Sequence, residues 1–140
     1  MSLTITRIYA APREAVWRAW TEPEQIAAWW GKRGWRTPVA SVTLDLRPGG
    51  AFRLASINEA DGRELRHDSV YREIVPPERL VFARGDEVAT LTLTDLGDGR
   101  TEMTFHTTAA VGETAAGGMS SAFDRLGELV THPHEQGATA

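Results

Sequence analysis

Six segments with strand-like patterning follow one another along the middle of the chain, and this succession constrains the fold more than any other feature. Each segment places β-branched and aromatic residues in alternation with polar ones, which is typical of half-buried strands. The segments span residues 39–46, 51–58, 64–74, 79–83, 88–94 and 102–108. The joints between them are short and rich in glycine, proline and aspartate. Such joints predict antiparallel neighbours in one sheet, because parallel strands need a long crossover.

Shorter elements precede this series. Residues 3–9 alternate as an opening strand, and Pro12 then suits the first turn of a short amphipathic helix that carries Trp17 and Trp20. Thr21 and Glu24 have the spacing of a capping box, which predicts the start of a second helix. That helix is expected to end at residue 31, a glycine able to adopt the left-handed conformation.

The C-terminal region carries the strongest helix signal. Residues 109–118 are small and glycine-rich, so we expect a loop there. One wide apolar face then follows at helical spacing, formed by Met119, Ala122, Phe123, Leu126, Leu129 and Val130. A strand, two short helices, an antiparallel sheet and one long helix together predict an α+β domain. A curved sheet folded around a single helix leaves room for a cavity.

Composition and charge exclude several function classes. The net charge of -4, with arginines scattered among acidic residues, leaves no basic patch for nucleic acid. The absence of cysteine removes disulfides and thiolate metal sites and fits the cytoplasm. No apolar run approaches the ~20 residues that span a bilayer, so no membrane association is expected. The length predicts one domain over residues 1–132, followed by a disordered tail over residues 133–140.

Four ordered motifs resemble the AHSA-like (activator of heat-shock-protein ATPase) branch of the START-like, or SRPBCC, helix-grip superfamily. They are APREAVWRAWTEPE at residues 11–24 continued by IAAWWG at 26–31, DLRPGG at 45–50, YREIVPPERL at 71–80, and FDRL at 123–126 after a glycine pair. The resemblance covers roughly residues 3–131. It implies a helix-grip fold, in which a curved antiparallel sheet wraps around a long C-terminal helix, with two short helices after the first strand.

The chain also departs from that family. The family usually has tryptophan where this sequence has Met119, and two of its loops are longer than the corresponding segments here. These loops commonly rim the cavity, so the identity of a ligand is not carried over from the resemblance.

The resemblance implies a cavity for a small hydrophobic or aromatic molecule between the long helix and the sheet. The residues expected to bind it are Trp30, Phe52, Leu54, His67, Ser69, Tyr71, Phe82, Leu91, Leu93, Phe105, Met119, Phe123 and Gly127. Plain core packing is the alternative for each of them, because periodicity does not separate a filled core from an empty one. Of the adjacent Trp29 and Trp30, only one is expected to reach the pocket mouth, since neighbours in a helix point about 100° apart.

His67 is the weak candidate for a catalytic residue. It lies mid-strand on the same face as Ser69 and Tyr71, and histidine titrates near neutral pH. A surface or hydrogen-bonded structural histidine is the alternative. His106 should point away from the face that Phe105 occupies. The remaining two histidines belong to the tail, and neither a metal nor a cofactor is expected.

Two further features have competing interpretations. Gly127 interrupts a strong helix, either to border the cavity or to pack tightly against a strand. Arg53 or Arg72, if it faced inward, would recognise a carboxylate or phenolate of the ligand. The alternative is cross-strand pairing on the surface with acidic residues such as Asp68.

Three functions are open at this point. The leading hypothesis is a protein, monomeric or weakly dimeric, that binds a small hydrophobic molecule. The second is a polyketide cyclase-like enzyme whose cavity positions a flexible substrate. The third is a co-chaperone-like interaction module. Convergent ionisable groups in the cavity would favour the enzyme, an apolar cavity the binding protein, and a large exposed apolar patch the interaction module.

Overall fold

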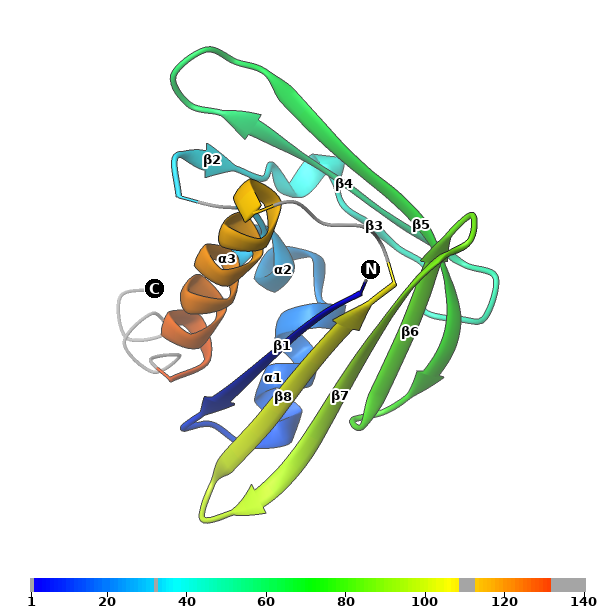
Figure 1. Cartoon of the computed structure of the whole chain (residues 1–140), viewed down its shortest axis with the longest axis vertical. Helices are drawn as coiled ribbons and strands as arrows, with labels where there is room; N and C mark the ends of the chain where they lie inside the picture. Colours follow the sequence, from blue (N-terminus) through cyan, green and yellow to red (C-terminus); the bar gives the residue numbers. More distant parts are fainter. Residues whose placement is uncertain (1, 32, 109–112, 132–140) are drawn as a thin grey trace.

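The chain forms one curved antiparallel sheet whose concave side is covered by helices (Figure 1). The computed structural model describes residues 2–31, 33–108 and 113–131. The strands are β1 (Leu3–Tyr9), β2 (Trp35–Arg36), β3 (Thr43–Leu44), β4 (Ala51–Asn58), β5 (Glu64–Val75), β6 (Arg79–Arg84), β7 (Glu87–Gly97) and β8 (Arg100–Thr107). The helices are α1 (Arg13–Thr21), α2 (Pro23–Trp29), the 3₁₀ helix η1 (Val39–Ser41) and α3 (Glu113–Thr131).

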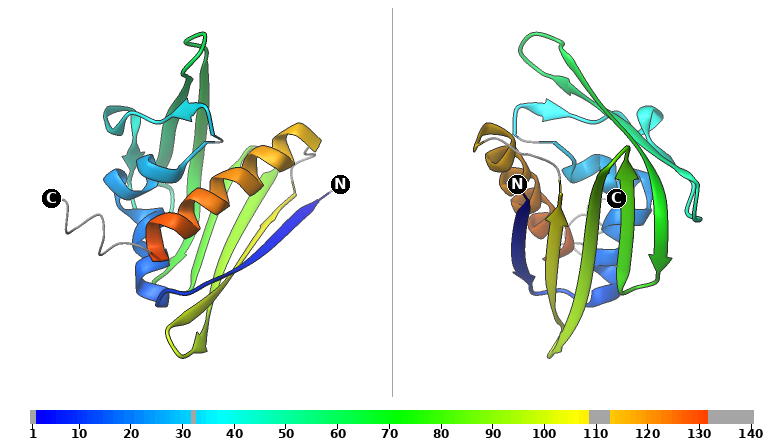
Figure 2. Two further views of the ribbon diagram at one scale, coloured as in Figure 1. Left: turned by 90° about the vertical axis from the view of Figure 1, so that its left-hand side faces the viewer. Right: turned by 45° about the vertical axis from the view of Figure 1, so that its right-hand side comes forward.

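The sheet is open. Its strands follow the order β1-β8-β7-β6-β5-β4-β2, with β3 paired to β4, and every pairing is antiparallel. The long helix α3 crosses the concave side, and α1 and α2 lie beside it (Figure 2). The α+β helix-grip fold expected from the sequence is therefore confirmed.

Alternation along the strands builds the inner face. In β8, Thr101, Met103 and Phe105 are buried, whereas the residues between them are partly exposed. His106 lies on the outer face, where its Nδ1 is 2.9 Å from Thr4 Oγ1 on the neighbouring strand. Its orientation opposite to Phe105 is the one expected from strand geometry.

The two short helices are held against each other by a tryptophan. Trp29 is fully buried and its indole Nε1 donates a hydrogen bond of 2.8 Å to the carbonyl oxygen of Ala19 in α1. α2 ends at this residue, and Gly31 then takes a left-handed φ of +88°. Glycine is suited to this position because other residues rarely adopt such a φ.

Helix α3 is tied to β1 at mid-length. The Tyr9 hydroxyl donates a 2.9 Å hydrogen bond to the carbonyl oxygen of Phe123. Next to it, the Arg7 guanidinium pairs with Asp124. On its other side, α3 reaches the end of α2, because the Arg125 guanidinium donates to the carbonyl oxygens of Gly31 and Ala28 at 2.9 and 3.0 Å.

Two predicted elements differ in the structure. Residues 39–46 were expected as a strand, but they form η1 and the two-residue β3, with Ser41 Oγ donating a 2.7 Å hydrogen bond to the Pro38 carbonyl. The predicted capping box also does not form. Thr21 belongs to the last turn of α1, where its hydroxyl donates to the Trp17 carbonyl at 2.8 Å, and the residue before Pro23 serves as the cap.

The start of α3 is the third difference. The helix begins at Glu113, within the stretch expected as a loop, and it includes both residues of the glycine pair at 117–118. Glycine weakens a helix by about 1 kcal/mol relative to alanine without forbidding it, so composition misplaced this boundary. The predicted tail over residues 133–140 lies outside the described residues.

Candidate functional site

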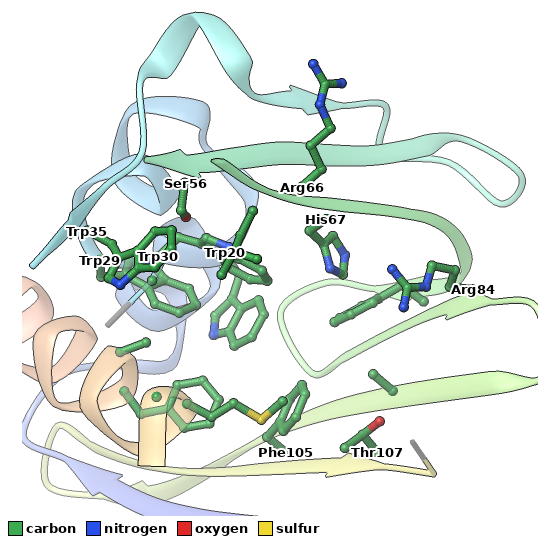
Figure 3. Close-up of a pocket in the computed structure, with 18 of the residues that line it drawn as sticks. Trp20, Trp29, Trp30, Trp35, Ser56, Arg66, His67, Arg84, Phe105 and Thr107 are labelled. Carbon is green, nitrogen blue, oxygen red and sulfur yellow. The ribbon is translucent and has the colours of Figure 1, made fainter. Parts of the chain in front are cut away.

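A cavity of about 630 Å³ lies between the sheet and the helices. Aromatic rings make up most of its wall, supplied by Trp20, Trp29, Trp30, Trp35, His67, Phe82, Phe105 and Phe123 (Figure 3). Polar side chains are fewer: Ser56, Arg66, Arg84, Glu87 and Thr107. Leu65, Arg84 and Glu87 are exposed residues on the hairpins, and they mark the side on which the cavity opens to solvent.

The tryptophans reach the cavity from α1, from the end of α2 and from β2. Trp20 and Trp29 meet edge to face with ring centroids 4.7 Å apart, a favourable aromatic geometry. Trp29 and Trp30 both line the cavity, with centroids 5.7 Å apart, although only one of the two was expected there. The 100° rule does not apply because Trp30 follows the last helical residue and has extended backbone angles, φ -64° and ψ 137°.

His67 provides the cavity with a polar atom set among rings. Its imidazole lies 5.1 Å from the Trp30 ring and 4.8 Å from the Phe52 ring, measured between centroids. One ring nitrogen, Nε2, is 2.8 Å from Ser69 Oγ. Ser69 is itself buried, and its hydroxyl also lies 3.4 Å from the Phe52 carbonyl oxygen.

The environment of His67 favours its neutral form. Its pKa is lowered from 6.5 to about 4, chiefly by burial and also by the positive charge of Arg84, against a smaller opposite effect of Asp68. The imidazole is therefore uncharged at pH 7. It can exchange a hydrogen bond with a ligand, but it carries no proton to donate as an imidazolium acid.

No metal centre emerges from the described residues, where no group of three or more acidic, histidine or cysteine side chains could hold an ion. The two tail histidines lie outside these residues. None of the described helices is long and apolar enough to cross a membrane.

Comparison with known proteins agrees with this architecture. Residues 10–131 match the family described as Activator of Hsp90 ATPase homolog 1-like protein. The chain belongs to this family. Membership is consistent with the SRPBCC superfamily expected from the four sequence motifs. Among curated proteins, no sequence matches the chain.

Several solved structures are similar to this chain over nearly its whole length. A crystal structure of a Chromobacterium violaceum protein has a TM-score of 0.86 at 27% identity, covering 94% of this chain and 98% of that one. An AHSA1-like protein of Aeromonas hydrophila, solved by NMR, has a TM-score of 0.80 at 23% identity, covering 93% and 92%. An AHSA1 protein of Silicibacter pomeroyi has 0.77 at 16%, covering 91% and 96%. At 23% and 16% identity, the last two similarities show a shared fold only.

The structure of this AHSA1-like domain brings six of the thirteen predicted site residues together around the cavity. These are Trp30, His67, Phe82, Phe105, Met119 and Phe123. Six others are buried in the core and do not line it: Phe52, Leu54, Ser69, Tyr71, Leu91 and Leu93. Phe52 and Tyr71, for example, stack on each other at 5.2 Å with an interplanar angle of 3°. Periodicity identified the inner face of each strand, but not which end of that face the cavity occupies.

Gly127 follows the second of its two interpretations. A Cβ atom at this position would lie 2.9 Å from Cε1 of the Tyr9 ring, which is closer than such atoms approach. The glycine is therefore the point at which α3 packs tightly against β1. It is not among the residues that line the cavity.

Neither Arg53 nor Arg72 faces inward. Arg53 lies on the surface and forms a 3.0 Å ion pair with Asp68, and Arg72 is exposed. Instead, Arg84 and Arg66 line the cavity. Arg84 is not predictable from the sequence because it lies in the joint between the predicted strands 79–83 and 88–94, where pattern gives no side-chain direction.

Proposed function

We propose that this AHSA1-like domain binds a small, largely aromatic molecule in the cavity between α3 and the sheet. The observation that carries the proposal is the cavity itself, about 630 Å³ in volume and walled by four tryptophans. Ligand pockets of soluble proteins typically enclose 300 to 1,000 Å³ behind apolar walls with a few polar groups. Rigid indole and phenyl rings offer large contact areas that lose little conformational freedom on binding.

Binding accounts for the polar groups better than catalysis does. His67 is neutral and hydrogen-bonded to Ser69, and its lowered pKa makes it a weak base. Two ionisable groups with opposed pKa shifts would mark an acid and base pair. The acidic side chain in the described lining of the cavity is Glu87, which is exposed and pairs with Arg84. The cyclase-like alternative therefore lacks the second group of such a pair.

An interaction module would need a contiguous apolar surface. The exposed large apolar residues of the described chain are distributed over β1, η1, β5, β7 and the loops, and include Ile8, Val39, Leu65 and Leu96. Single exposed apolar residues are normal on soluble proteins. We therefore place ligand binding before co-chaperone activity.

Titration with N-phenyl-1-naphthylamine, a neutral dye whose fluorescence rises in apolar surroundings, tests the proposal. We expect saturable binding to the wild type at one site. Ala122 is buried on α3 and lines the cavity, so Ala122→Phe introduces a ring into the space that a ligand needs. The dye should then bind about tenfold more weakly or not at all, as expected for a loss of 1.4 kcal/mol or more.

Ala28→Phe is the matched control, because Ala28 is exposed on α2 and the same exchange adds the same ring outside the cavity. Circular dichroism and thermal melting establish that both variants are folded. Equal dye binding by both variants, or no saturable binding by the wild type, would rule out the cavity as the ligand site.

A further inference from the structure

Arg84 lies at the border between the aromatic cavity and solvent. It is the last residue of β6, directly before the turn to β7, and it lines the cavity together with Glu87 from the far side of that turn. In Figure 3 the guanidinium of Arg84 lies on one side of His67 and the four labelled tryptophans lie on the other. The cavity thus has a polar side and an aromatic side.

The guanidinium of Arg84 has hydrogen-bonding capacity to spare. Its ion pair with Glu87 is loose, with 3.7 Å between Nη2 and Oε1, beyond the usual length of a hydrogen bond. Among the described residues it makes no hydrogen bond within the usual geometry, although a guanidinium offers five N–H donors in a planar fork.

Arg66, the other cavity-lining arginine, is arranged differently. Its Nε donates a 2.9 Å hydrogen bond to Glu64, and its side chain extends away from the cavity in Figure 3. Arg84 is therefore the cation that a bound molecule would meet.

The charge balance at this side is also informative. Among the cavity-lining residues that the structure describes, Glu87 is the acidic one, and the cation beside it is Arg84, because Arg66 points away and pairs with Glu64. A ligand anion would replace Glu87 as the partner of Arg84 and gain the closer, two-pronged geometry that the present pair lacks.

We propose that the ligand of this cavity is an amphipathic aromatic acid, whose ring system lies against the tryptophans and whose carboxylate binds Arg84 at the opening. The inference rests on the proposed function and adds the chemical class of the ligand. His67 faces the same ligand as a neutral hydrogen-bonding group, which suits a hydroxyl or carbonyl between the rings and the carboxylate. An acid of this kind is oriented as well as bound, because its two ends require different surroundings.

Competition against the bound dye tests this inference with a pair of isosteric molecules. 2-Naphthoate and 2-naphthamide have the same ring system and nearly the same shape, but only the first is an anion. We expect 2-naphthoate to displace N-phenyl-1-naphthylamine from the wild type at lower concentration. Arg84→Gln should raise the concentration of 2-naphthoate needed for displacement about tenfold, the scale of one charged hydrogen-bonding partner. The concentration of 2-naphthamide needed should change less than about twofold. Glu87→Gln should strengthen the binding of 2-naphthoate, since it removes the carboxylate that competes for Arg84.

Arg53→Gln is the control, because it removes the same charge from an equally exposed position on the outer face, where Arg53 pairs with Asp68. It should leave both competitors unchanged. If the dye binds but the acid has no advantage over the amide, or if Arg84→Gln and Arg53→Gln affect the acid equally, the carboxylate site is overturned and the cavity proposal stands. If neither naphthalene displaces the dye, the aromatic-acid class is likewise overturned. Failure of the dye to bind the wild type would instead remove the proposed function itself.

Discussion

The two halves of α3 have opposite surroundings. Towards the C-terminal end, Leu126 and Val130 are buried and Gly127 lies against the Tyr9 ring, so the space between helix and strand is filled. Towards the N-terminal end, Met119 and Phe123 line the cavity, and Met119 remains partly exposed. One helix therefore closes the core at one end and borders an open space at the other.

This difference assigns different tasks to the two ends. The filled end supplies the apolar burial that stabilises the fold, at roughly 25 cal/mol for each Å² removed from water. The hydrogen bond from Tyr9 to the Phe123 carbonyl lies between the two halves and fixes the helix on β1. Because the helix is anchored there, its other half can stand away from the sheet without the fold collapsing onto the cavity.

The largest effect should come from placing a charge at the filled end. Leu126 has 0% exposure, so Leu126→Asp buries an unpaired carboxylate and should lower the free energy of unfolding by more than about 3 kcal/mol. Met119→Asp makes the same change two turns earlier, where the side chain can reach solvent, and should cost less than about 1 kcal/mol. Urea unfolding of both variants measures the contrast. Similar losses at the two positions would mean that α3 is not divided in this way.

Adding a side chain at the closest contact should have a smaller effect. In Gly127→Leu the first added carbon already lies 2.9 Å from the Tyr9 ring, so helix and strand must separate. We expect a loss of about 2 kcal/mol, since overpacking costs about 1 to 3 kcal/mol and the gain in helix propensity offsets part of it. Binding of the neutral dye should persist because the residue does not line the cavity. Undiminished stability with lost dye binding would return Gly127 to the ligand site.

At the cavity, the stability of the protein should depend on pH through His67. His67 has a folded pKa of about 4 against an ordinary value of 6.5, so the unfolded chain binds the extra proton between these values. The contribution of His67 is therefore complete above pH 6.5 and is lost as the pH falls towards 4. Between pH 7.5 and 5 the loss should reach up to about 2 kcal/mol.

His67→Phe isolates this contribution, because it removes the titrating group and keeps a ring in the wall. Its free energy of unfolding, measured by urea titration at each pH, should fall less steeply than that of the wild type below pH 6.5. Parallel curves for the two proteins would show that the imidazole is solvated in the folded state.

The fold could be predicted from the sequence because its signals are local. Alternation in β4 and the glycine-containing turns each identify an element from a few neighbouring residues, and antiparallel pairing then follows from short connections. The residues that departed from prediction use their hydroxyl groups in hydrogen bonds other than those that their spacing favoured. Thr21 turns its hydroxyl to the Trp17 carbonyl, and Ser41 ends a short 3₁₀ helix, where sequence spacing favoured a cap and a strand.

For the candidate site, the sequence could predict only which face of each strand points inward. Phe82 and Phe52 both point to the concave side, yet of the two only Phe82 lines the cavity. The rings of Trp30, His67 and Phe82, which do line it, lie against Phe52 at centroid distances of 5.7, 4.8 and 4.8 Å. No periodicity distinguishes Phe82 from Phe52, because the cavity depends on how far α3 stands from each part of the sheet. The direction of Arg84 depends on the geometry of one turn, which composition does not specify.

The clustering of indole rings around the cavity also gives the protein an intrinsic spectroscopic signal for ligand binding. Four of the five tryptophans line the cavity, and the rings of Trp20 and Trp29 are close enough at 4.7 Å for their electronic transitions to couple. A molecule entering the cavity would change the polarity around several indole rings at once. Near-ultraviolet circular dichroism and emission wavelength would then report occupancy without any label. Trp17, which lies outside the cavity lining, supplies the constant background against which the change is seen.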